Sequence, residues 1–284
     1  MEKRIFGKTG LGISVFAFGG IVVKDTAQSE ADSIVSEAID RGINYFDVAP
    51  SYGNSQEILG PAIAPHRSKI YLACKTGKKT RDEAQAELEN SIKLLKTDYF
   101  DVYQLHGVRP EDVDVILGKN GALEVLAEAK QKGLARNIGI TTHFDEVALK
   151  LMSAFDFDTL LFPVNWACML KNGLGTETLK AAAKRNMGRA AIKGLADQAK
   201  INKEDGYPKC WYKPIYDNPR LADLALRFTL SQDVHTAVSP GDARMLRLGL
   251  SIMEKYNGRI LVLDAGEMEE LKKYASMVEK TVFE

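Results

Sequence analysis

Two side chains suited to proton transfer stand close together in the segment GINYFDVAPSYGNSQEILG, residues 42–60. Asp47 ends a short apolar and aromatic run, and Tyr52 follows in a Pro-Ser-Tyr-Gly loop. Two later apolar runs end in Lys75 and His106. An ammonium favours the phenolate form and lowers the pKa of a phenol from its usual value of about 10. A carboxylate can in turn balance the charge of a buried lysine.

These four side chains predict a general acid placed over a carbonyl oxygen. Tyr52 is the expected proton donor, Lys75 and Asp47 are expected to tune its pKa, and His106 can hydrogen-bond the same oxygen. Reduction of a carbonyl also needs hydride, which no side chain delivers, so the chemistry predicts a nicotinamide or a similar cofactor. The chain has no Gly-x-Gly-x-x-Gly motif after a strand and no Walker P-loop.

Short apolar runs predict the strands that must position these groups. Eight of them start near Val15, Tyr45, Tyr71, Val102, Asn137, Leu160, Arg189 and Thr236. Helical patterns fall between them, at Glu30–Arg41, Arg81–Leu95, Ala122–Gln131, Glu146–Ser153, Thr178–Asn186 and Leu221–Leu230. Thr80 and Glu83 resemble a capping box, and Gly42 and Gly133 stand where helix C-caps are expected.

Strands and helices that alternate in this way predict parallel strands joined by right-handed crossovers. Eight units close naturally into a (β/α)8 TIM barrel, and an open doubly wound sheet is the alternative. A hairpin over residues 3–14 is expected to close the barrel bottom, and an extra C-terminal helix, Glu267–Lys280, to pack across the barrel. Strands two, three and four would then bring Asp47, Tyr52, Lys75 and His106 to one mouth of the barrel.

One long segment interrupts the regular spacing of strands and helices. Residues 194–216, from Gly194 to Tyr216, are rich in aromatic side chains and predict a lid or substrate loop, or alternatively a loop packed on the barrel rim. Trp166 and Trp211 could line an apolar pocket or simply pack in the core. No linker divides the chain, so residues 1–284 are expected to form a single domain.

The composition of the chain argues against some classes of binding partner and indicates the cellular compartment. Among 284 residues, 38 Lys plus Arg balance 38 Asp plus Glu, so no overall field favours nucleic acid or an anionic membrane. Three cysteines stand far apart with no C-x-x-C motif, which predicts reduced thiols in the cytoplasm and no zinc ribbon. The sequence shows neither a signal peptide nor a membrane-spanning run.

Ordered segments along nearly the whole chain resemble the aldo-keto reductases, which are NAD(P)H-dependent (β/α)8 oxidoreductases. They are GINYFDVAPSYG with its following LG, SKIYLACKTG, DYFDVYQLHG, GLARNIGITTH and AVSPG. The resemblance implies that Tyr52 is the general acid in reduction and the base in oxidation, that Lys75 and Asp47 tune it, and that His106 orients the carbonyl. The substrate would be a small aldehyde or ketone, and no metal is implied.

The same resemblance implies a set of cofactor-binding residues: Gly19, Gly20, Thr141, Thr142, Ile192, Ser239, Gly241 and Arg244. Several depart from the family pattern. Thr141-Thr142 stands where Ser-Asn is frequent, Leu161 replaces a Gln, and Ile192 replaces an aromatic residue or Met that supports the nicotinamide ring.

The stretch Ser239–Arg244 resembles the loop that holds the adenosine 2′-phosphate. Arg244 could pair with that phosphate, and Arg247 lies one helical turn beyond. This favours NADP(H) over NAD(H), although Asp242 would repel the phosphate unless it points away. The alternative is an ordinary helix start with Asp242 favoured by the helix dipole and both arginines solvated.

Two other functions fit parts of the sequence. The altered cofactor positions are compatible with a regulatory or accessory protein that binds the cofactor on the same barrel with little turnover. A barrel lyase or aldolase would use Lys75 as a Schiff-base nucleophile, which requires that this lysine has no tight carboxylate partner.

Overall fold

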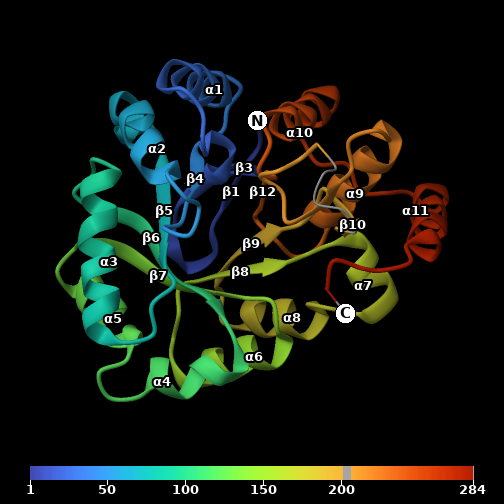
Figure 1. Ribbon diagram of the computed structural model, residues 1–284. Coiled ribbons are helices and arrows are strands. Elements are labelled where there is room, and N and C mark those ends of the chain that lie inside the picture. The colour runs from blue at the N-terminus through green and yellow to red at the C-terminus, as the bar shows by residue number, and fades with distance from the viewer. Residues whose placement is uncertain (201–205, 284) are drawn as a thin grey trace.

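The structure, a computed structural model that describes residues 1–200 and 206–283, is built around a closed barrel of parallel strands (Figure 1). Within this described part, eight strands form the barrel in the order β12 (Thr236–Val238), β3 (Phe16–Gly19), β4 (Tyr45–Asp47), β5 (Tyr71–Thr76), β6 (Phe100–Val108), β7 (Ala135–Thr142), β8 (Thr159–Pro163) and β9 (Gly188–Ile192). The predicted (β/α)8 barrel is therefore confirmed, and each predicted strand overlaps one of these.

Helices surround the barrel as an outer ring (Figure 1). They are α1 (Gln28–Asp40), α2 (Ser55–Ile63), α3 (Arg81–Leu94), α4 (Val113–Leu117), α5 (Ala122–Gln131), α6 (Asp145–Ala154), α7 (Trp166–Asn172), α8 (Thr176–Lys184), α9 (Pro219–Ser231), α10 (Ala243–Lys255) and α11 (Ala265–Met277). Short 3-10 turns lie at η1 (Gly7–Thr9), η2 (Gly20–Val23), η3 (Ala64–Lys69) and η4 (Pro110–Asp112). No helix in the described ranges combines the length and apolar character that crossing a membrane requires.

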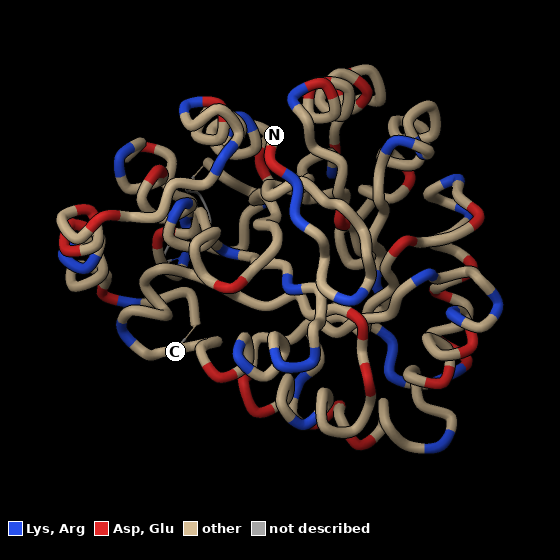
Figure 2. The backbone as a smooth tube through the Cα atoms, turned by 180° about the vertical axis from the view of Figure 1, so that it is seen from behind, with Lys and Arg blue, Asp and Glu red and all other residues tan. Residues whose placement is uncertain are grey.

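Apolar side chains pack on both faces of the barrel strands. Inside the barrel, Tyr45, Val102 and Leu161 pack with Phe6. A larger cluster fills the space between the strands and the inner faces of the helices. Because parallel barrel strands are buried on both faces, their sequences read as short continuous apolar runs. Acidic and basic residues are instead interspersed around the outer helices (Figure 2).

The N-terminal hairpin forms as predicted. Strands β1 (Lys3–Ile5) and β2 (Gly12–Ser14) pair antiparallel, and Gly10, in the turn between them, has a φ of 72°. Phe6 is fully buried at the barrel bottom, where its ring lies 5.5 Å from that of Tyr45. The hairpin therefore closes this end of the barrel, which leaves the other end for a site.

Two local predictions are wrong. Thr80 starts α3, but its hydroxyl donates to Glu83 at 2.6 Å instead of accepting from the backbone, so no capping box forms. The C-terminal helix α11 packs on the outer helices α7 and α9 instead of across the barrel. The chain after α11 turns back toward α7, where the carbonyl of Phe283 lies 3.7 Å from the Cys168 sulfur.

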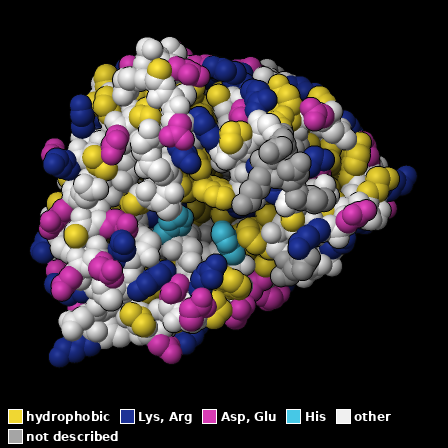
Figure 3. All heavy atoms as spheres, in the orientation of Figure 1, with side chains coloured by type: hydrophobic (Ala, Val, Ile, Leu, Met, Phe, Trp, Pro, Cys, Tyr) yellow, Lys and Arg dark blue, Asp and Glu magenta, His cyan; other side chains and the backbone are white. Residues whose placement is uncertain are grey.

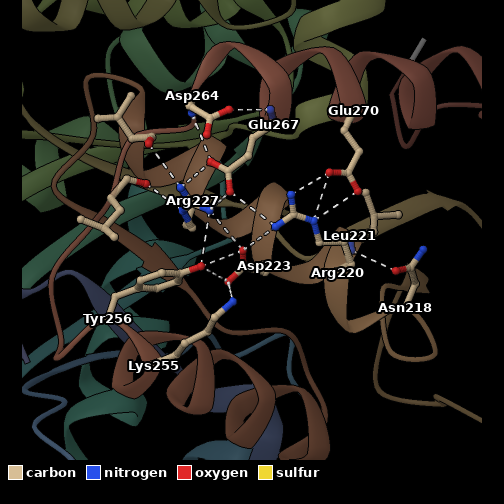
Figure 4. Close-up of polar contacts among 12 residues, drawn as sticks. Asn218, Arg220, Leu221, Asp223, Arg227, Lys255, Tyr256, Asp264, Glu267 and Glu270 are labelled. Carbon is tan, nitrogen blue, oxygen red and sulfur yellow. Dashed lines mark hydrogen bonds and ion pairs between the residues drawn. The ribbon is translucent and has the colours of Figure 1, made fainter.

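An ion-pair cluster fixes α11 to α9 (Figure 4). Arg227 of α9 donates to both carboxylate oxygens of Glu267, each at 2.7 Å, and to Asp223 at 3.2 Å. Tyr256, just after α10, donates its hydroxyl to Asp223 at 2.8 Å. Only 5% of the Arg227 side chain is exposed, so these contacts are much less screened than surface pairs.

Candidate active site

A cavity of about 340 Å³ opens where the barrel strands end at their carboxyl ends. On this face of the molecule, histidine side chains lie beside a hollow with apolar walls (Figure 3). The predicted site residues that line the cavity are Gly19, Asp47, Tyr52, His106, Thr141, Ile192, Ser239 and Gly241. The strand register explains this grouping, since Asp47 pairs with Gly19 of β3 on one side and with Ala73 of β5 on the other.

Lys75 and Asp47 form a buried ion pair beneath the cavity. Lys75 Nζ lies 2.6 Å from Asp47 Oδ2 and donates to the Val48 carbonyl at 3.2 Å. The Lys75 side chain is 0% exposed. Burial disfavours its charge, but the charge and hydrogen bond of Asp47, together with the attraction of Tyr52 and Cys74, outweigh this and raise the pKa of Lys75. A lysine that is charged, enclosed and tightly paired cannot attack a carbonyl, which removes the basis for the Schiff-base alternative.

Tyr52 lies between this ion pair and the cavity. The Lys75 ammonium is 5.2 Å from the centre of the Tyr52 ring. Burial raises the pKa of Tyr52, and this exceeds the lowering by the charge of Lys75. Lys75 thus lowers the pKa of the phenol in the predicted direction, but desolvation is larger, so the pKa of Tyr52 is raised overall. At neutral pH Tyr52 holds its proton, as a general acid must before it donates.

His106 lies beside the loop that carries Tyr52, with its Nδ1 3.5 Å from the hydroxyl oxygen of Ser51. Its ring meets that of Tyr52 edge-on, with 6.0 Å between centroids. Burial, followed by the charge of Lys75, holds the pKa of His106 well below its usual value. A neutral imidazole still has one N–H donor, so His106 can donate a hydrogen bond to a carbonyl oxygen without bringing a charge.

The wall next to Tyr52 suits a planar nicotinamide ring. Leu161 and Ile192 line it with apolar side chains. Thr141 accepts a hydrogen bond from the Gly107 N–H at 2.7 Å, and within the described residues its hydroxyl has no acceptor. Asp47 Oδ1 is buried there without a hydrogen-bond partner among the described residues. A free hydroxyl donor, a free carboxylate acceptor and an apolar wall fit the carboxamide, ribose and ring of such a cofactor.

Ser239, which directly follows β12, packs closely against Gly19 in the cavity lining, and Gly241 is also tightly packed there. The Ser239 hydroxyl oxygen accepts from the Gly19 N–H at 2.9 Å. A Cβ on Gly19 would stand 2.4 Å from the Ser239 carbonyl oxygen, and one on Gly241 would stand 2.2 Å from the Lys209 carbonyl oxygen. Close backbone packing therefore requires glycine at both positions, whatever the cavity holds.

Three predicted cofactor residues do not line the cavity. Thr142 is fully buried on the other side of β7, where its hydroxyl donates to the Val108 carbonyl at 2.7 Å. Gly20 packs so closely that an added Cβ would lie 2.8 Å from Cβ of Val48. Arg244 lies outside the cavity at the start of α10.

Asp242 holds Arg244 in place. Two nitrogens of Arg244 contact the two Asp242 carboxylate oxygens, at 2.9 Å and 2.8 Å, and a third contact reaches the Gly206 carbonyl at 2.8 Å. Asp242 also accepts from the Arg244 N–H at 2.8 Å and so caps α10. Arg247 pairs with Glu37 at 2.9 Å. The carboxylate does not point away, so a 2′-phosphate must compete with it for Arg244.

Sequence reasoning did not single out several other residues that line the cavity, among them His143, Lys193, Val282 and Phe283. Two of them could have been predicted, because site residues of such barrels stand at the carboxyl ends of strands. His143 directly follows β7, and Lys193 directly follows β9. Val282 and Phe283 carry no signal in the sequence, since a chain end reaches the site only through the packing of α11. The ring of Phe283 lies 4.6 Å from that of His143.

The long segment between β9 and α9 contributes two aromatic residues, Trp211 and Tyr212, to the cavity lining. Strands β10 (Ala196–Ala199) and β11 (Tyr212–Pro214) pair antiparallel within it, and the intervening positions 201–205 are outside the described residues. Trp211 is 59% exposed and lies 5.6 Å from the Tyr52 ring. Trp166, in contrast, is a core residue that donates to the Ala196 carbonyl at 2.9 Å.

This chain is similar in sequence and in fold to known proteins. The model of the aldo/keto reductase family matches residues 10–209. The oxidoreductase YqkF of Bacillus subtilis is 26% identical over 317 residues, covering 100% of this chain and 98% of that protein. L-galactose dehydrogenase of Arabidopsis thaliana is 32% identical over 156 residues, which are 50% of this chain and 48% of the plant protein. The holo form of a Bacillus halodurans aldo-keto reductase has a similar fold, with a TM-score of 0.74, 21% identity and complete coverage (100%) of both chains.

Proposed function

The chain belongs to the aldo/keto reductase family, and we propose that it is an NAD(P)H-dependent reductase of small aldehydes or ketones. Oxidoreductases among its relatives support the reaction type. The observation that carries the proposal is the position of Tyr52, which lines the cavity next to the buried pair of Lys75 and Asp47 and next to His106.

In this proposal Tyr52 gives its proton to the carbonyl oxygen during reduction. Its raised pKa keeps the proton on the phenol until a negative charge develops on that oxygen. Lys75 then stabilises the phenolate left behind, because its ammonium is fixed 5.2 Å from the ring centre. Asp47 keeps Lys75 charged and in place, and the neutral His106 donates a hydrogen bond that orients the carbonyl.

Members of this family use nicotinamide cofactors, and when bound such a cofactor supplies hydride to the carbonyl carbon. Thr141 would hold the carboxamide, Asp47 Oδ1 a ribose hydroxyl, and Ile192 with Leu161 one face of the ring. We favour NADP(H) over NAD(H), with Arg244 as the ligand of the 2′-phosphate once it leaves Asp242.

A Tyr52→Phe variant tests the proposal. Reduction of a panel of aldehydes and ketones, followed by loss of NADPH absorbance, should fall by at least about 100-fold, as is usual when a general acid is removed. Binding of NADPH, measured by calorimetry, should be unchanged. Tyr212→Phe removes a second phenol from the same cavity and is the matched control. Full activity of Tyr52→Phe would show that Tyr52 is not the proton donor.

The alternative is a cofactor-binding regulatory or accessory protein on the same barrel. Two observations favour it, namely the apolar Leu161 in the cavity wall and the engagement of Arg244 by Asp242. Tight binding of NADPH or NADH together with no reduction of any carbonyl in the panel by the wild-type protein would support this alternative.

A further inference from the structure

Lys193 places a cationic side chain in the same cavity as Tyr52, directly after β9. Its ammonium lies 4.5 Å from the ring centre of Tyr212 and 5.1 Å from that of Trp211. Both distances are within the range of a cation–π contact. The two rings therefore hold the ammonium in a defined place at the wall of the cavity.

No Asp or Glu of the described residues forms an ion pair with Lys193, and its ammonium has no hydrogen-bond acceptor among them. Lys75, the other lysine at this end of the barrel, has Asp47 at 2.6 Å. A partly buried ammonium without an anionic partner is costly, because the rings replace only part of its lost hydration. Consistent with this, burial lowers the pKa of Lys193 to about 8.

The backbone at Lys193 is fixed in an unusual conformation. Its φ is 69°, in the left-handed region where a residue with a Cβ is strained. Its carbonyl accepts from Asn165 Nδ2 at 3.0 Å and from the Ala196 N–H at 3.0 Å. Strained residues persist where the surroundings over-determine them, which is frequent at functional sites. The turn therefore keeps Lys193 in the cavity lining in spite of its backbone strain.

The charges that surround the cavity also favour an anion. Asp47 is the one acidic side chain among the described residues that line it, and Lys75 balances its charge. Burial, followed by the charges of Lys193 and Arg109, lowers the pKa of His143 to about 4, so this histidine is neutral. The cavity thus carries one unbalanced positive charge, on Lys193, with uncharged polar and aromatic groups around it.

We propose that Lys193 is an anion-binding residue of this cavity, which pairs with a negatively charged group of a molecule bound next to Tyr52. The proposal deepens the proposed reductase function and rests on it. Two molecules could supply the group, either a carbonyl substrate that also carries a carboxylate or the bound cofactor through its diphosphate. The chemistry is the same in both, an ammonium paired with an oxyanion under partial desolvation.

The test compares Lys193→Met, which removes the charge at similar length, with Lys193→Arg, which keeps it. Lys213→Met is the control for loss of a lysine from the same segment, since Lys213 is half exposed and pairs with Asp197 at 2.9 Å. Calorimetry measures binding of NADPH and NADH in one arm. In the other arm, protein saturated with NADP⁺ is titrated with 4-formylbenzoate and with its uncharged methyl ester.

Lys193→Met should lower the affinity for one of the anionic ligands by about 10-fold or more. Lys193→Arg and Lys213→Met should bind these ligands as tightly as the wild type does. A loss confined to 4-formylbenzoate, with the ester unaffected, assigns the anion to the substrate. A loss for both reduced cofactors assigns it to the diphosphate. Unchanged affinity of Lys193→Met for every ligand would overturn the proposal. Because these are binding measurements, they remain decisive even if Tyr52→Phe disproves the reductase function.

Discussion

The ammonium of Lys75 and the carboxylate of Asp47 lie 2.6 Å apart at the ends of neighbouring strands, and both side chains are almost completely enclosed. The pair does more than neutralise a buried charge. One Asp47 oxygen holds Lys75, and the other is buried without a hydrogen-bond partner among the described residues, in a residue that lines the cavity. Asp47 therefore connects the group that stabilises a Tyr52 phenolate with the place where a cofactor is expected.

Breaking this pair should cost stability as well as activity. Asp47→Asn leaves Lys75 charged and unpaired, which we expect to lower the free energy of unfolding by about 3–5 kcal/mol. Lys75→Met combined with Asp47→Asn should recover much of the stability but no carbonyl reduction. Urea denaturation measures the first effect and NADPH oxidation the second.

An exposed pair serves as the control for this prediction. Lys180 and Glu177 lie 2.8 Å apart on the surface of α8, with most of each side chain exposed. Glu177→Gln should leave the free energy of unfolding nearly unchanged, because the pair is screened by solvent. A similar small change for Asp47→Asn would contradict the view that Asp47 is the required counter-ion of Lys75.

The pair of Arg227 and Glu267 should make the protein sensitive to acid. The hydrogen bonds from Arg227 lower the pKa of Glu267 from 4.5 to about 2. A depressed carboxyl pKa stabilises the fold above the unfolded value of 4.5, and this contribution disappears as the pH falls toward 2. Solvent reaches part of the Glu267 side chain, so screening makes its contribution to stability smaller than the full shift would give.

Urea denaturation as a function of pH checks this prediction. The wild type should lose more stability than Glu267→Gln between about pH 5 and about pH 2, because the variant has no carboxyl to protonate. Glu270→Gln, which removes a more exposed partner of Arg220 on the same helix, should keep most of the wild-type slope. Equal slopes for wild type and Glu267→Gln would show that another group causes the acid sensitivity.

Asp242 should limit the preference for NADP(H). Its carboxylate occupies Arg244 through two contacts, so a 2′-phosphate must displace it and also approach its negative charge. Asp242→Asn keeps an amide oxygen that can cap α10 but removes the charge. We expect NADPH to bind about 10-fold more tightly to this variant, with NADH affinity nearly unchanged.

Calorimetric titration with both reduced cofactors measures this effect. Arg244→Met is the matched control, and it should lose affinity for NADPH whether or not Asp242 is present. If Asp242→Asn leaves the ratio of the two affinities unchanged, the 2′-phosphate is not recognised at Arg244.

The barrel strands were predictable because burial on both faces leaves a simple signal. Each strand is a short apolar run between polar segments, and each predicted run overlaps a strand of the barrel. The segment between β9 and α9 lacks that signal. Its strands β10 and β11 are short and pair only with each other, and the aromatic residues of the segment that line the cavity are the adjacent Trp211 and Tyr212, so no regular alternation marks them.

Site residues could be predicted from the sequence only where their place at the carboxyl end of a barrel strand is enough to bring them to the cavity. Asp47, Lys75 and His106 follow from that rule, whereas Thr142 does not, because successive residues of a strand point to opposite faces. Thr141 therefore faces the cavity and Thr142 the Val108 carbonyl. The engagement of Arg244 by Asp242 depends on side-chain conformation, which residue spacing does not specify.

Anion binding at Lys193 should weaken above about pH 8. The pKa of Lys193 is lowered to about 8 by burial, so the side chain is an ammonium below this pH and loses its charge as the pH rises through it. Neighbouring groups do not change charge in this range, since the pKa of Cys210 is raised to about 11 and that of His143 is lowered to about 4, both mainly by burial.

Binding of the anionic ligand identified by the Lys193 variants should be measured from about pH 6.5 to about pH 9.5, with the methyl ester as the uncharged comparison. Wild-type affinity should fall by up to about 10-fold for each pH unit above the pKa, whereas Lys193→Arg should show little change because arginine stays charged. The ester should bind equally across the range in both proteins. Parallel pH profiles for wild type and Lys193→Arg would mean that a different group titrates, and that the charge of Lys193 does not control binding of the anion.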